Sequence, residues 1–525
     1  MIRRRRMFAA VAVACSAVLV LGACGSSGSD TASAQDTAAV GDPVAGGSAT
    51  ILQAGEPRSL DPAALSNTWA HQPVLGNALY GELIITNNDT FDVEYRMATD
   101  FSTEDNGKTF TLALQPDLKF SDGTPLDAAA VKFNWDRLKD PALASTTIRQ
   151  ASQIESTEVV DPTTLRVTMV EPNPQFAQAI VAGALNWIAS PAALEQGQQA
   201  FDENPIGAGP FTLVNWTRQD SIRLEKNESY WDAPKPYLDE LTIRTVADYN
   251  QRLNAATTGA ADLSMESSWT SLERAESAGL ATQVTSTGGG QFAAMNFRRA
   301  PFDDERARRA VSLAVDLDAA NTVVYNGEGE IPRTFFPEDS PYYADIQLSE
   351  TNTEEAQKLF DELAAEGKPV SFTYLAYPTA EARSLGEAIQ AQLGAFENVD
   401  MQVEVLDYPT LTARAGARDF DMIISSAITQ DPDFPLSIAF DSTSTGNFTG
   451  INDPELDAAL ERGRFGATVE ERKEAYDVVQ QRLADQVVGL WYVRATPSVA
   501  YSKDLQGVQL YTLGSPMPAE FWLSN

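Results

Sequence analysis

The sequence predicts an α/β protein that is built from more than one lobe. Past residue 290, segments with helical periodicity alternate regularly with short apolar segments that are typical of strands. Strands separated by helices favour a largely parallel sheet covered on both faces, and ligands of such open sheets lie outside the carboxyl ends of the strands. The stretch from about 48 to 525 is too long for one ordinary domain, so two or three lobes are expected.

Up to about residue 290 the strand and helix signals are mixed. Residues 109–114 alternate apolar and polar side chains, as a half-buried strand does. The turn at 121–125 leads into a helix, for which Thr124 is the expected N-cap and Pro125 the first helical residue. The apolar face of that helix would consist of Val131, Trp135 and Leu138. Further strands are expected at 165–169, 221–226 and 241–246.

The regular alternation begins with a helix that runs from near Asp303 to a stop at Gly327. The next helix opens with a capping-box pattern at 351–354 and ends at Gly367. Strands are then expected at 370–376, 401–406 and 421–426, with helices between them. Two more helices are expected to begin at Pro454 and after Thr468, where Glu471 completes the cap.

The first segment predicts export. Residues 3–6 are arginines, and the apolar run 7–23 that follows is shorter than the ~20 residues of a spanning helix, so 1–23 is predicted to be a signal peptide. The run ends at Leu-Gly-Ala-Cys, which resembles the lipobox of bacterial lipoproteins and makes Cys24 the expected lipidation site. The alternative is an ordinary cleaved signal with Cys24 a spare thiol. Residues 24–47 are rich in small and polar side chains and would form a flexible tether.

Composition excludes several classes of function. The formal net charge of −35 repels nucleic acid, so no nucleic-acid partner is expected. His71 is the only histidine, which leaves little room for histidine-based catalysis or zinc binding, and the sequence has no phosphate-binding loop and no EF-hand pattern. No cofactor is expected. Acidic residues are plentiful, so composition does not dismiss a hydrolase that uses a carboxylate pair.

Seven short motifs share an order and spacing with a known family. They lie at 56–62, 79–83, 118–126, 207–211 with 230–231, 295–304, 431–433 and 452–457. The most specific is Leu-Lys-Phe-Ser-Asp-Gly-Thr-Pro-Leu at 118–126. Each alone is weak, because glycines and prolines also simply turn the backbone. Together they resemble the family 5 extracellular solute-binding proteins, the oligopeptide, dipeptide and nickel receptors of ABC importers.

The resemblance implies a two-lobed, periplasmic-binding-protein-like fold of the large type II class, hinged by two crossovers. Lobe I would take 48–88, 205–287 and 491–525, an extra subdomain 89–204, and lobe II 288–490. Such a protein makes and breaks no bond, so it would not be an enzyme. It would be a monomer anchored through Cys24 outside the cytoplasmic membrane, with a peptide or small-molecule ligand and ABC permease subunits as partners.

The resemblance also guides the choice of ligand contacts. Peptide receptors of this family bind the ligand's amino terminus with an acid shortly before an Asp-Pro-Asp stretch, yet that position holds Ile428. Either Asp431 or Asp433 substitutes, or the ligand has no free amino terminus there. Nickel is disfavoured because His71 lies outside lobe II. The residues expected to contact ligand are Pro57, Arg58, Trp187, Asn296, Ser426, Asp431 and Phe448.

Two other classes of function stay open at this point. A secreted acidic hydrolase would need two carboxylates that face each other in a cleft. A surface sensor or adhesin would have another protein as its partner and would show a large exposed apolar patch.

Overall fold

The computed structural model describes residues 41–67, 69, 71–88 and 90–524. The predicted signal peptide, Cys24 and the predicted tether as far as residue 40 lie outside these ranges. Among the helices in the described ranges, none combines the length and the apolar character that a membrane span requires.

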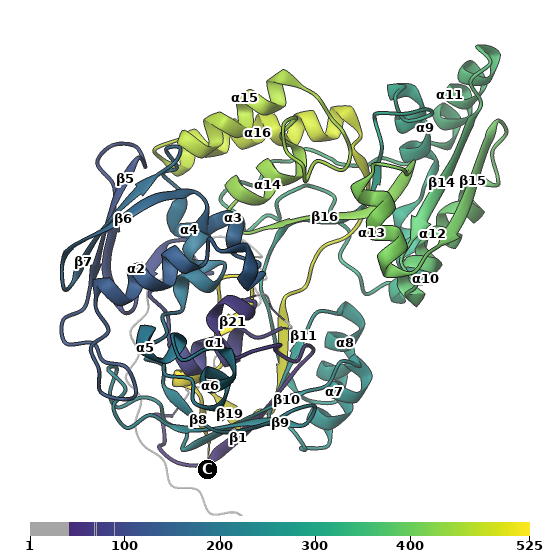
Figure 1. Cartoon of the computed structure of the whole chain (residues 1–525). Helices are drawn as coiled ribbons and strands as arrows, with labels where there is room; N and C mark the ends of the chain where they lie inside the picture. The colour runs from purple at the N-terminus through teal and green to yellow at the C-terminus, as the bar shows by residue number, and fades with distance from the viewer. Residues whose placement is uncertain (1–40, 68, 70, 89, 525) are drawn as a thin grey trace, which may run out of the picture. The chain divides into compact units, whose positions relative to one another are not determined.

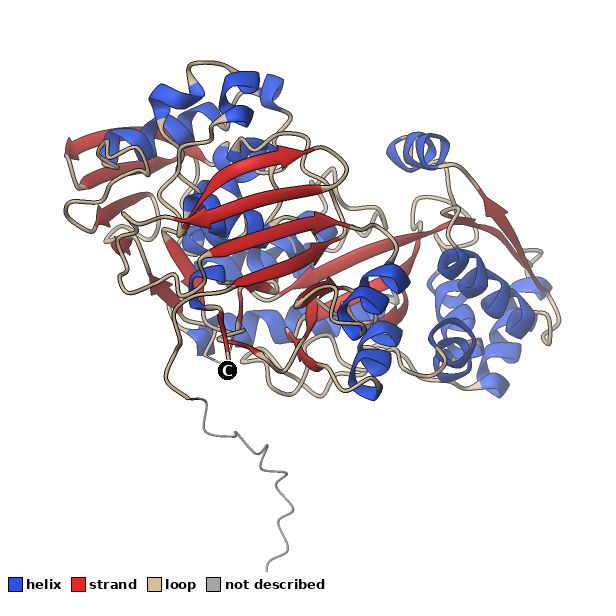
Figure 2. Ribbon diagram, turned by 90° about the horizontal axis from the view of Figure 1, so that it is seen from below, coloured by secondary structure: helices blue, strands red, loops and turns tan. Residues whose placement is uncertain are grey.

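A seven-stranded sheet draws its strands from distant parts of the chain. Figure 2 shows strands in red lying side by side with helices in blue around them. The central strand of the seven-stranded sheet, β1 (Ser48–Gln53), is parallel to β10 (Glu240–Thr245) on one side and to β11 (Leu263–Glu266) on the other. The other pairings are antiparallel. They involve β8 (Phe211–Thr217), β9 (Ser221–Lys226), β12 (Ala281–Val284) and β18 (Ser498–Tyr501). The helices α7 (Tyr249–Thr257) and α8 (Trp269–Ser277) pack beside β11, β12 and β18.

A second, five-stranded sheet has the order β15-β14-β16-β13-β17. Its strands are β13 (Gly288–Met295), β14 (Val370–Ala376), β15 (Val399–Val405), β16 (Met422–Thr429) and β17 (Gly489–Val493). β14 is parallel to β15 and β16, whereas β13 is antiparallel to β16 and β17. The expectation of a largely parallel sheet is therefore wrong for half of the pairings. The chain enters this sheet through β13 and leaves it through β17. Because both strands connect to the other large sheet, they run in opposite directions.

Helices cover both faces of the five-stranded sheet, as predicted (Figure 1). Side chains alternate along β13, so that Ala293 and Met295 enter one core and Phe292 and Ala294 the other. The first core includes α9 (Glu305–Ala314), α10 (Leu317–Tyr325), α11 (Thr353–Ala365) and α12 (Ala380–Leu393). The second includes α13 (Tyr408–Gly416), α14 (Asp433–Phe440), α15 (Pro454–Phe465) and α16 (Val469–Gln486).

The chain passes between the two large sheets twice. Residues 285–287 join β12 to β13, and residues 494–497 join β17 to β18. The two connections lie side by side, because the amide of Thr285 donates to the carbonyl of Pro497 (2.8 Å). The guanidinium of buried Arg494 ties the connections to a neighbouring loop. It donates to the carbonyl oxygens of Thr287, Thr334 and Phe335 at 2.9, 3.1 and 3.0 Å.

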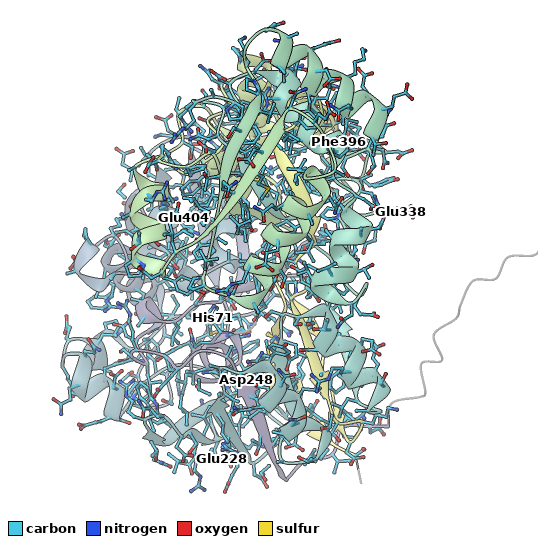
Figure 3. All side chains as sticks on the ribbon, turned by 90° about the vertical axis from the view of Figure 1, so that its right-hand side faces the viewer. His71, Glu228, Asp248, Glu338, Phe396 and Glu404 are labelled. Atoms are coloured by element: carbon cyan, nitrogen blue, oxygen red, sulfur yellow. The ribbon has the colours of Figure 1, made fainter. Side chains whose placement is uncertain are left out.

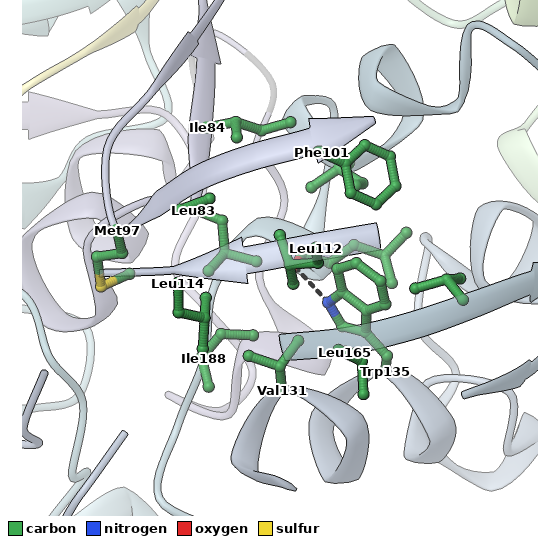
Figure 4. Packing of buried hydrophobic residues seen from close by; sticks show 14 of the residues in the cluster. Leu83, Ile84, Met97, Phe101, Leu112, Leu114, Val131, Trp135, Leu165 and Ile188 are labelled. Carbon is green, nitrogen blue, oxygen red and sulfur yellow. Dashed lines mark hydrogen bonds between the residues drawn. The ribbon is translucent and has the colours of Figure 1, made fainter. Parts of the chain in front are cut away.

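A third sheet is wholly antiparallel and has the order β4-β5-β7-β6. Its strands are β4 (Ala98–Ser102), β5 (Thr109–Leu114), β6 (Ile154–Asp161) and β7 (Thr164–Met169). The helix α2 (Ala128–Arg137) packs on it through Trp135, which is fully buried and donates its indole N–H to the carbonyl of Leu185 at 2.7 Å (Figure 4). The predicted strand at 109–114 and the predicted buried face of the helix are confirmed.

The remaining elements are short. They are α1 (Pro73–Tyr80), β2 (Ile84–Thr86), β3 (Val93–Tyr95), α3 (Ile148–Ala151), α4 (Phe176–Val181), α5 (Pro191–Leu194), α6 (Gln198–Glu203), β19 (Leu505–Gln506), β20 (Leu510–Tyr511), β21 (Ser515–Pro516) and β22 (Trp522–Leu523). The negative charge is spread over the surface, where exposed Glu228, Asp248, Glu338 and Glu404 belong to separate segments of the chain (Figure 3).

Two glycines of the 207–211 motif allow close packing. A Cβ on Gly207 would lie 2.1 Å from the carbonyl oxygen of Leu79, and one on Gly209 would lie 2.3 Å from that of Ala78. Both carbonyls belong to α1. The motif therefore needs glycine because the backbone runs directly against a helix end.

The helix expected to run from near Asp303 to Gly327 is two helices. Val315 has extended backbone angles between α9 and α10, and Asp316 caps α10 by accepting hydrogen bonds from the amides of Asp318 and Ala319 at 2.9 and 3.1 Å. An aspartate side chain competes for backbone amides in this way and can interrupt an otherwise continuous helical pattern.

The start of α2 differs from the prediction. Asp122 Oδ1 accepts hydrogen bonds from the amide and the hydroxyl of Thr124 (2.9 and 2.6 Å), so Thr124 is held in the preceding turn. The N-cap is Asp127, which accepts from the amide of Ala130 at 3.0 Å.

We expect Asp127→Ala to lower the free energy of unfolding by about 1 kcal/mol, because an amide of the first turn loses its acceptor. Thr124→Ala should lower the free energy of unfolding by clearly less, since the helix does not begin at Thr124. Urea unfolding of both variants checks this. Equal losses, or a larger loss for Thr124→Ala, would contradict the assignment of the cap.

Candidate functional site

The five-stranded sheet borders a cavity of about 920 Å³. Residues 423–428 of β16 form one wall, and others come from α12, α13, α14 and the loop at 445–448. Trp69, Arg149 and Leu513 join from other parts of the chain. The volume lies at the upper end of the range of about 300–1,000 Å³ that is usual for small-molecule sites.

The cavity lies where open sheets usually bind ligands. Tyr377 follows the carboxyl end of β14, Tyr408 follows that of β15, and Phe434 follows that of β16, and all three line the cavity. These are the three mutually parallel strands of the sheet. The position thus agrees with the expectation from strand order.

Most of the lining is apolar. The rings of Tyr377 and Tyr408 lie 5.2 Å apart, and Tyr408 keeps 55% of its surface exposed. Phe434, Ile438 and Phe448 add further apolar surface. Such walls bury the apolar parts of a ligand, at about 25 cal/mol for each Å² removed from water.

Of the seven residues predicted to contact ligand, the structure brings two into the cavity, Ser426 and Phe448. Asp431 lines a smaller neighbouring cavity of about 70 Å³, together with Gln430 and residues of α4. Pro57 and Arg58 are engaged elsewhere. The carbonyl of Pro57 accepts from Arg218 (2.9 Å), and the guanidinium of Arg58 donates to the carbonyl of Ala144 (3.0 Å).

Trp187 and Asn296 are buried in this structure and do not line the cavity, and their contact with ligand stays a prediction. Trp187 packs its ring against Gly76 and donates its indole N–H to Asn77 Oδ1 at 3.0 Å. Asn296 donates to the carbonyl oxygens of Arg418 (3.2 Å) and Phe420 (2.8 Å). Both side chains hold the fold together.

Asp431 and Asp433 are already paired. The two carboxylate oxygens of Asp431 accept from Arg472 at 2.7 and 2.9 Å, and Arg472 also donates to the hydroxyl of Tyr342 at 2.6 Å. Asp433 accepts from Arg464 at 2.8 Å, and burial raises the pKa of this carboxyl. Both acids are thus engaged in ion pairs, and the two alternatives, substitution by Asp431 or Asp433 and a ligand without a free amino terminus there, stay predictions.

No local sequence signal marks the charged residues of the cavity. Arg149 lies on the short helix α3 and Glu381 on the first turn of α12, and both line the cavity. Neither belongs to a motif, and more than 200 residues separate them. Only the fold brings them to one site.

Residues 92–448 match the family described as bacterial extracellular solute-binding proteins, family 5 middle. The chain belongs to family 5 of these solute-binding proteins. The resemblance seen in the seven motifs is thereby confirmed.

Two curated relatives of this family 5 protein are glutathione-binding proteins named GsiB. The protein from Escherichia coli (strain K12) is 33% identical over 234 residues, which cover 44% of this chain and 45% of the relative, so the match spans about half of the relative's length. The one from Pectobacterium atrosepticum is 28% identical over 431 residues, which cover 78% of this chain and 82% of the relative.

A solved structure shows the same fold. The crystal structure of the dipeptide binding protein from Pseudoalteromonas sp. SM9913 in complex with Met-Leu superposes on this family 5 protein with a TM-score of 0.74 at 22% identity. The match covers 91% of this chain and all of that one. The predicted two-lobed, periplasmic-binding-protein-like fold is confirmed.

Proposed function

We propose that this family 5 protein is the substrate-binding lipoprotein of an ABC importer. It captures an oligopeptide in the cavity beside β16 and delivers it to the membrane permease. The observation that carries the proposal is the cavity itself, because its walls come from β16, α12, α13 and α14 and from Trp69, Arg149 and Leu513. Family membership and the names of the relatives support it.

The two connections at 285–287 and 494–497 would act as the hinge between lobe I (48–88, 205–287 and 491–525, with the subdomain 89–204) and lobe II (288–490). Paired, hydrogen-bonded connections allow one motion, in which the lobes close over a ligand. Closure removes the solute from water and strengthens each polar contact. The ligand's higher affinity for the closed form shifts the equilibrium from the open to the closed form.

The hydrolase alternative finds no support in the cavity. A carboxylate-pair mechanism needs two acids that flank the scissile bond. Among the described residues that line the cavity, Glu381 is the only acid. The arrangement therefore favours binding without turnover.

Calorimetric titration of the purified mature protein with defined oligopeptides tests the proposal. We expect saturable binding of one peptide per protein, and the peptide should be recovered intact. Mass spectrometry of ligand that co-purifies with the native protein would name the solute. Flat titrations across peptide, sugar and metal-chelate libraries would contradict the proposal, and released cleavage products would favour a hydrolase.

The proposal includes a lipid anchor at Cys24. We expect Cys24→Ser to release the protein from the membrane fraction into the medium or periplasm, because a single change removes the acyl chains that hold it. Fractionation and a mass measurement of the mature N-terminus check this. The variant should bind peptide as the wild type does. If Cys24→Ser still sedimented with membranes, and if neither the wild type nor the variant carried lipid, a lipid anchor at Cys24 would be excluded.

A further inference from the structure

Three consecutive glycines at 288–290 let the start of β13 lie directly against both neighbouring strands. A Cβ on Gly289 would lie 2.0 Å from the carbonyl oxygen of Ala427 on β16. One on Gly290 would lie 2.3 Å from the carbonyl oxygen of Val493 on β17. Real side chains do not tolerate such distances, so both positions need glycine. The glycine run therefore fixes the backbone directly before residue 291.

The residue that follows the glycines lines the cavity. The ladder between β13 and β17 shifts its register between Gln291 and Phe292. An irregularity of this kind re-aims a side chain and is common beside binding sites. Among the described residues that line the cavity, Gln291 is the one that β13 contributes. Phe292 is buried instead and stacks on Trp491, with the ring centroids 4.3 Å apart.

The amide of Gln291 is held in one orientation. Tyr492, on β17 and 3% exposed, donates its hydroxyl to Gln291 Oε1 at 2.6 Å. A side-chain amide has one acceptor oxygen and an NH₂ group with two donors. Because Tyr492 occupies the oxygen, the NH₂ group is the end left for other partners. This group makes no hydrogen bond with the described residues.

We propose that Gln291 is a specificity-determining residue, whose side-chain NH₂ donates to a peptide-bond carbonyl oxygen of the ligand. Tyr492 is the positioning residue that keeps the NH₂ group turned toward the cavity. This inference rests on the proposed function and deepens it. A ligand that places a carbonyl oxygen at Gln291 satisfies the donor. A ligand that places a methylene or another donor there leaves it unpaired, and an unpaired polar group weakens binding.

Gln291→Glu changes the group that the ligand meets and little else. The two side chains have nearly the same shape, and a carboxylate still offers an acceptor oxygen to Tyr492. The donors are replaced by an oxygen that repels a carbonyl oxygen. In equilibrium dialysis with a pool of tripeptides built from Leu, Phe and Val, quantified by mass spectrometry, we expect the variant to retain about 10- to 100-fold less peptide than the wild type at neutral pH.

Acid distinguishes a lost donor from a distorted cavity. At about pH 4 the introduced carboxyl is mostly protonated, and its O–H can donate in place of the amide. The ratio of wild-type to variant retention should therefore fall as the pH is lowered from 7 to 4. Glu381, the acid among the described residues of the cavity lining, titrates in both proteins, so the ratio isolates the introduced carboxyl. A damaged fold would not be repaired by acid.

Gln509→Glu is the matched control. Gln509 also accepts from a tyrosine hydroxyl, that of Tyr511 at 3.0 Å, but it is exposed and does not line the cavity. This variant should retain peptides as the wild type does at every pH.

A further pair of variants tests the positioning role of Tyr492. Tyr492→Phe should lower retention about 3- to 10-fold, because the amide of Gln291 loses its fixed orientation. Added to Gln291→Leu, the same change should have no further effect on retention, since no amide is left to orient. Equal losses in both backgrounds would show that Tyr492 acts on the fold alone.

If Gln291→Glu retains peptides as well as the wild type, or if its loss is the same at pH 7 and pH 4, the inference is overturned and the proposed function stands. A second pool, amidated at the carboxyl end, identifies the acceptor. A difference between wild type and variant in both pools supports the peptide-bond carbonyl, and one confined to the free pool overturns it. If the wild type retains no peptide, this inference and the peptide ligand both fail.

Discussion

Replacing Glu82 by Gln should stabilise the protein, and the gain should grow as the pH rises. Glu82 keeps 5% of its surface exposed, and its Oε1 has no hydrogen-bond partner among the described residues. Burial raises the pKa of this carboxyl to about 8, against a smaller opposing effect of Arg96 and with a further rise from the charge of Glu520. The folded protein therefore keeps this side chain protonated at neutral pH.

The sign of the pH dependence follows from proton binding. Below a pH of about 4.5, Glu82 is protonated in both the folded and the unfolded state. Its ionisation then does not lower the free energy of unfolding. Between about 4.5 and 8 the unfolded chain ionises while the folded one does not, so stability falls by about 1.4 kcal/mol for each pH unit. The loss from this group reaches roughly 3–5 kcal/mol by pH 8.

Urea unfolding of the wild type and of Glu82→Gln at pH 5, 6, 7 and 8 checks this prediction. The difference between their free energies of unfolding isolates Glu82, since every other group titrates in both proteins. We expect the difference to favour the variant increasingly from pH 5 to pH 8. Two parallel curves would mean that Glu82 ionises in the folded state at its ordinary pKa.

Arg472→Met should destabilise the protein by about 3–5 kcal/mol, because it leaves a carboxylate buried without its partner. Arg472 and Asp431 expose 7% and 13% of their side chains and form a two-pronged ion pair. Arg472 lies on α16, so the pair joins this helix to the segment between β16 and α14.

The double variant Arg472→Met/Asp431→Asn is the control. Removing both charges abolishes the unpaired carboxylate, so thermal or urea unfolding should show that much of the lost stability returns. A double variant that is no more stable than Arg472→Met would contradict the assignment of the lost stability to an unpaired carboxylate.

Much of the fold could be predicted because its signals are local. The strand at 370–376 coincides with β14, and the cap at Thr468 lies where the pattern placed it. The helix α11 is capped by Asn352, one residue after the Thr351 of the predicted capping box. Predictions failed where two local signals competed. Asp122 holds Thr124 in a turn, and Asp316 interrupts the helix that apolar periodicity alone would continue.

The antiparallel entry of β13 into the second sheet has no local signal. It depends on which strand pairs with which, and β13 pairs with β16 and β17 more than 120 residues away in sequence. Periodicity reports whether a residue is buried, and it says nothing about strand direction.

The ligand site was predictable only in part. Ser426 lies five residues before the motif at 431–433 and Phe448 four residues before the motif at 452–457, and both line the cavity. Trp187 and Asn296 are buried, because a large aromatic ring and an amide with backbone partners are equally useful inside a core. Arg149 and Glu381 could not be found this way, because neither belongs to a motif and only the fold brings them to one cavity.

Small-angle X-ray scattering of the mature protein, with and without saturating oligopeptide, would show whether the lobes close. We expect the radius of gyration to fall when peptide binds, because the two lobes close about the connections at 285–287 and 494–497. Scattering curves that superpose, measured on protein that calorimetry shows to be saturated, would contradict capture by closure.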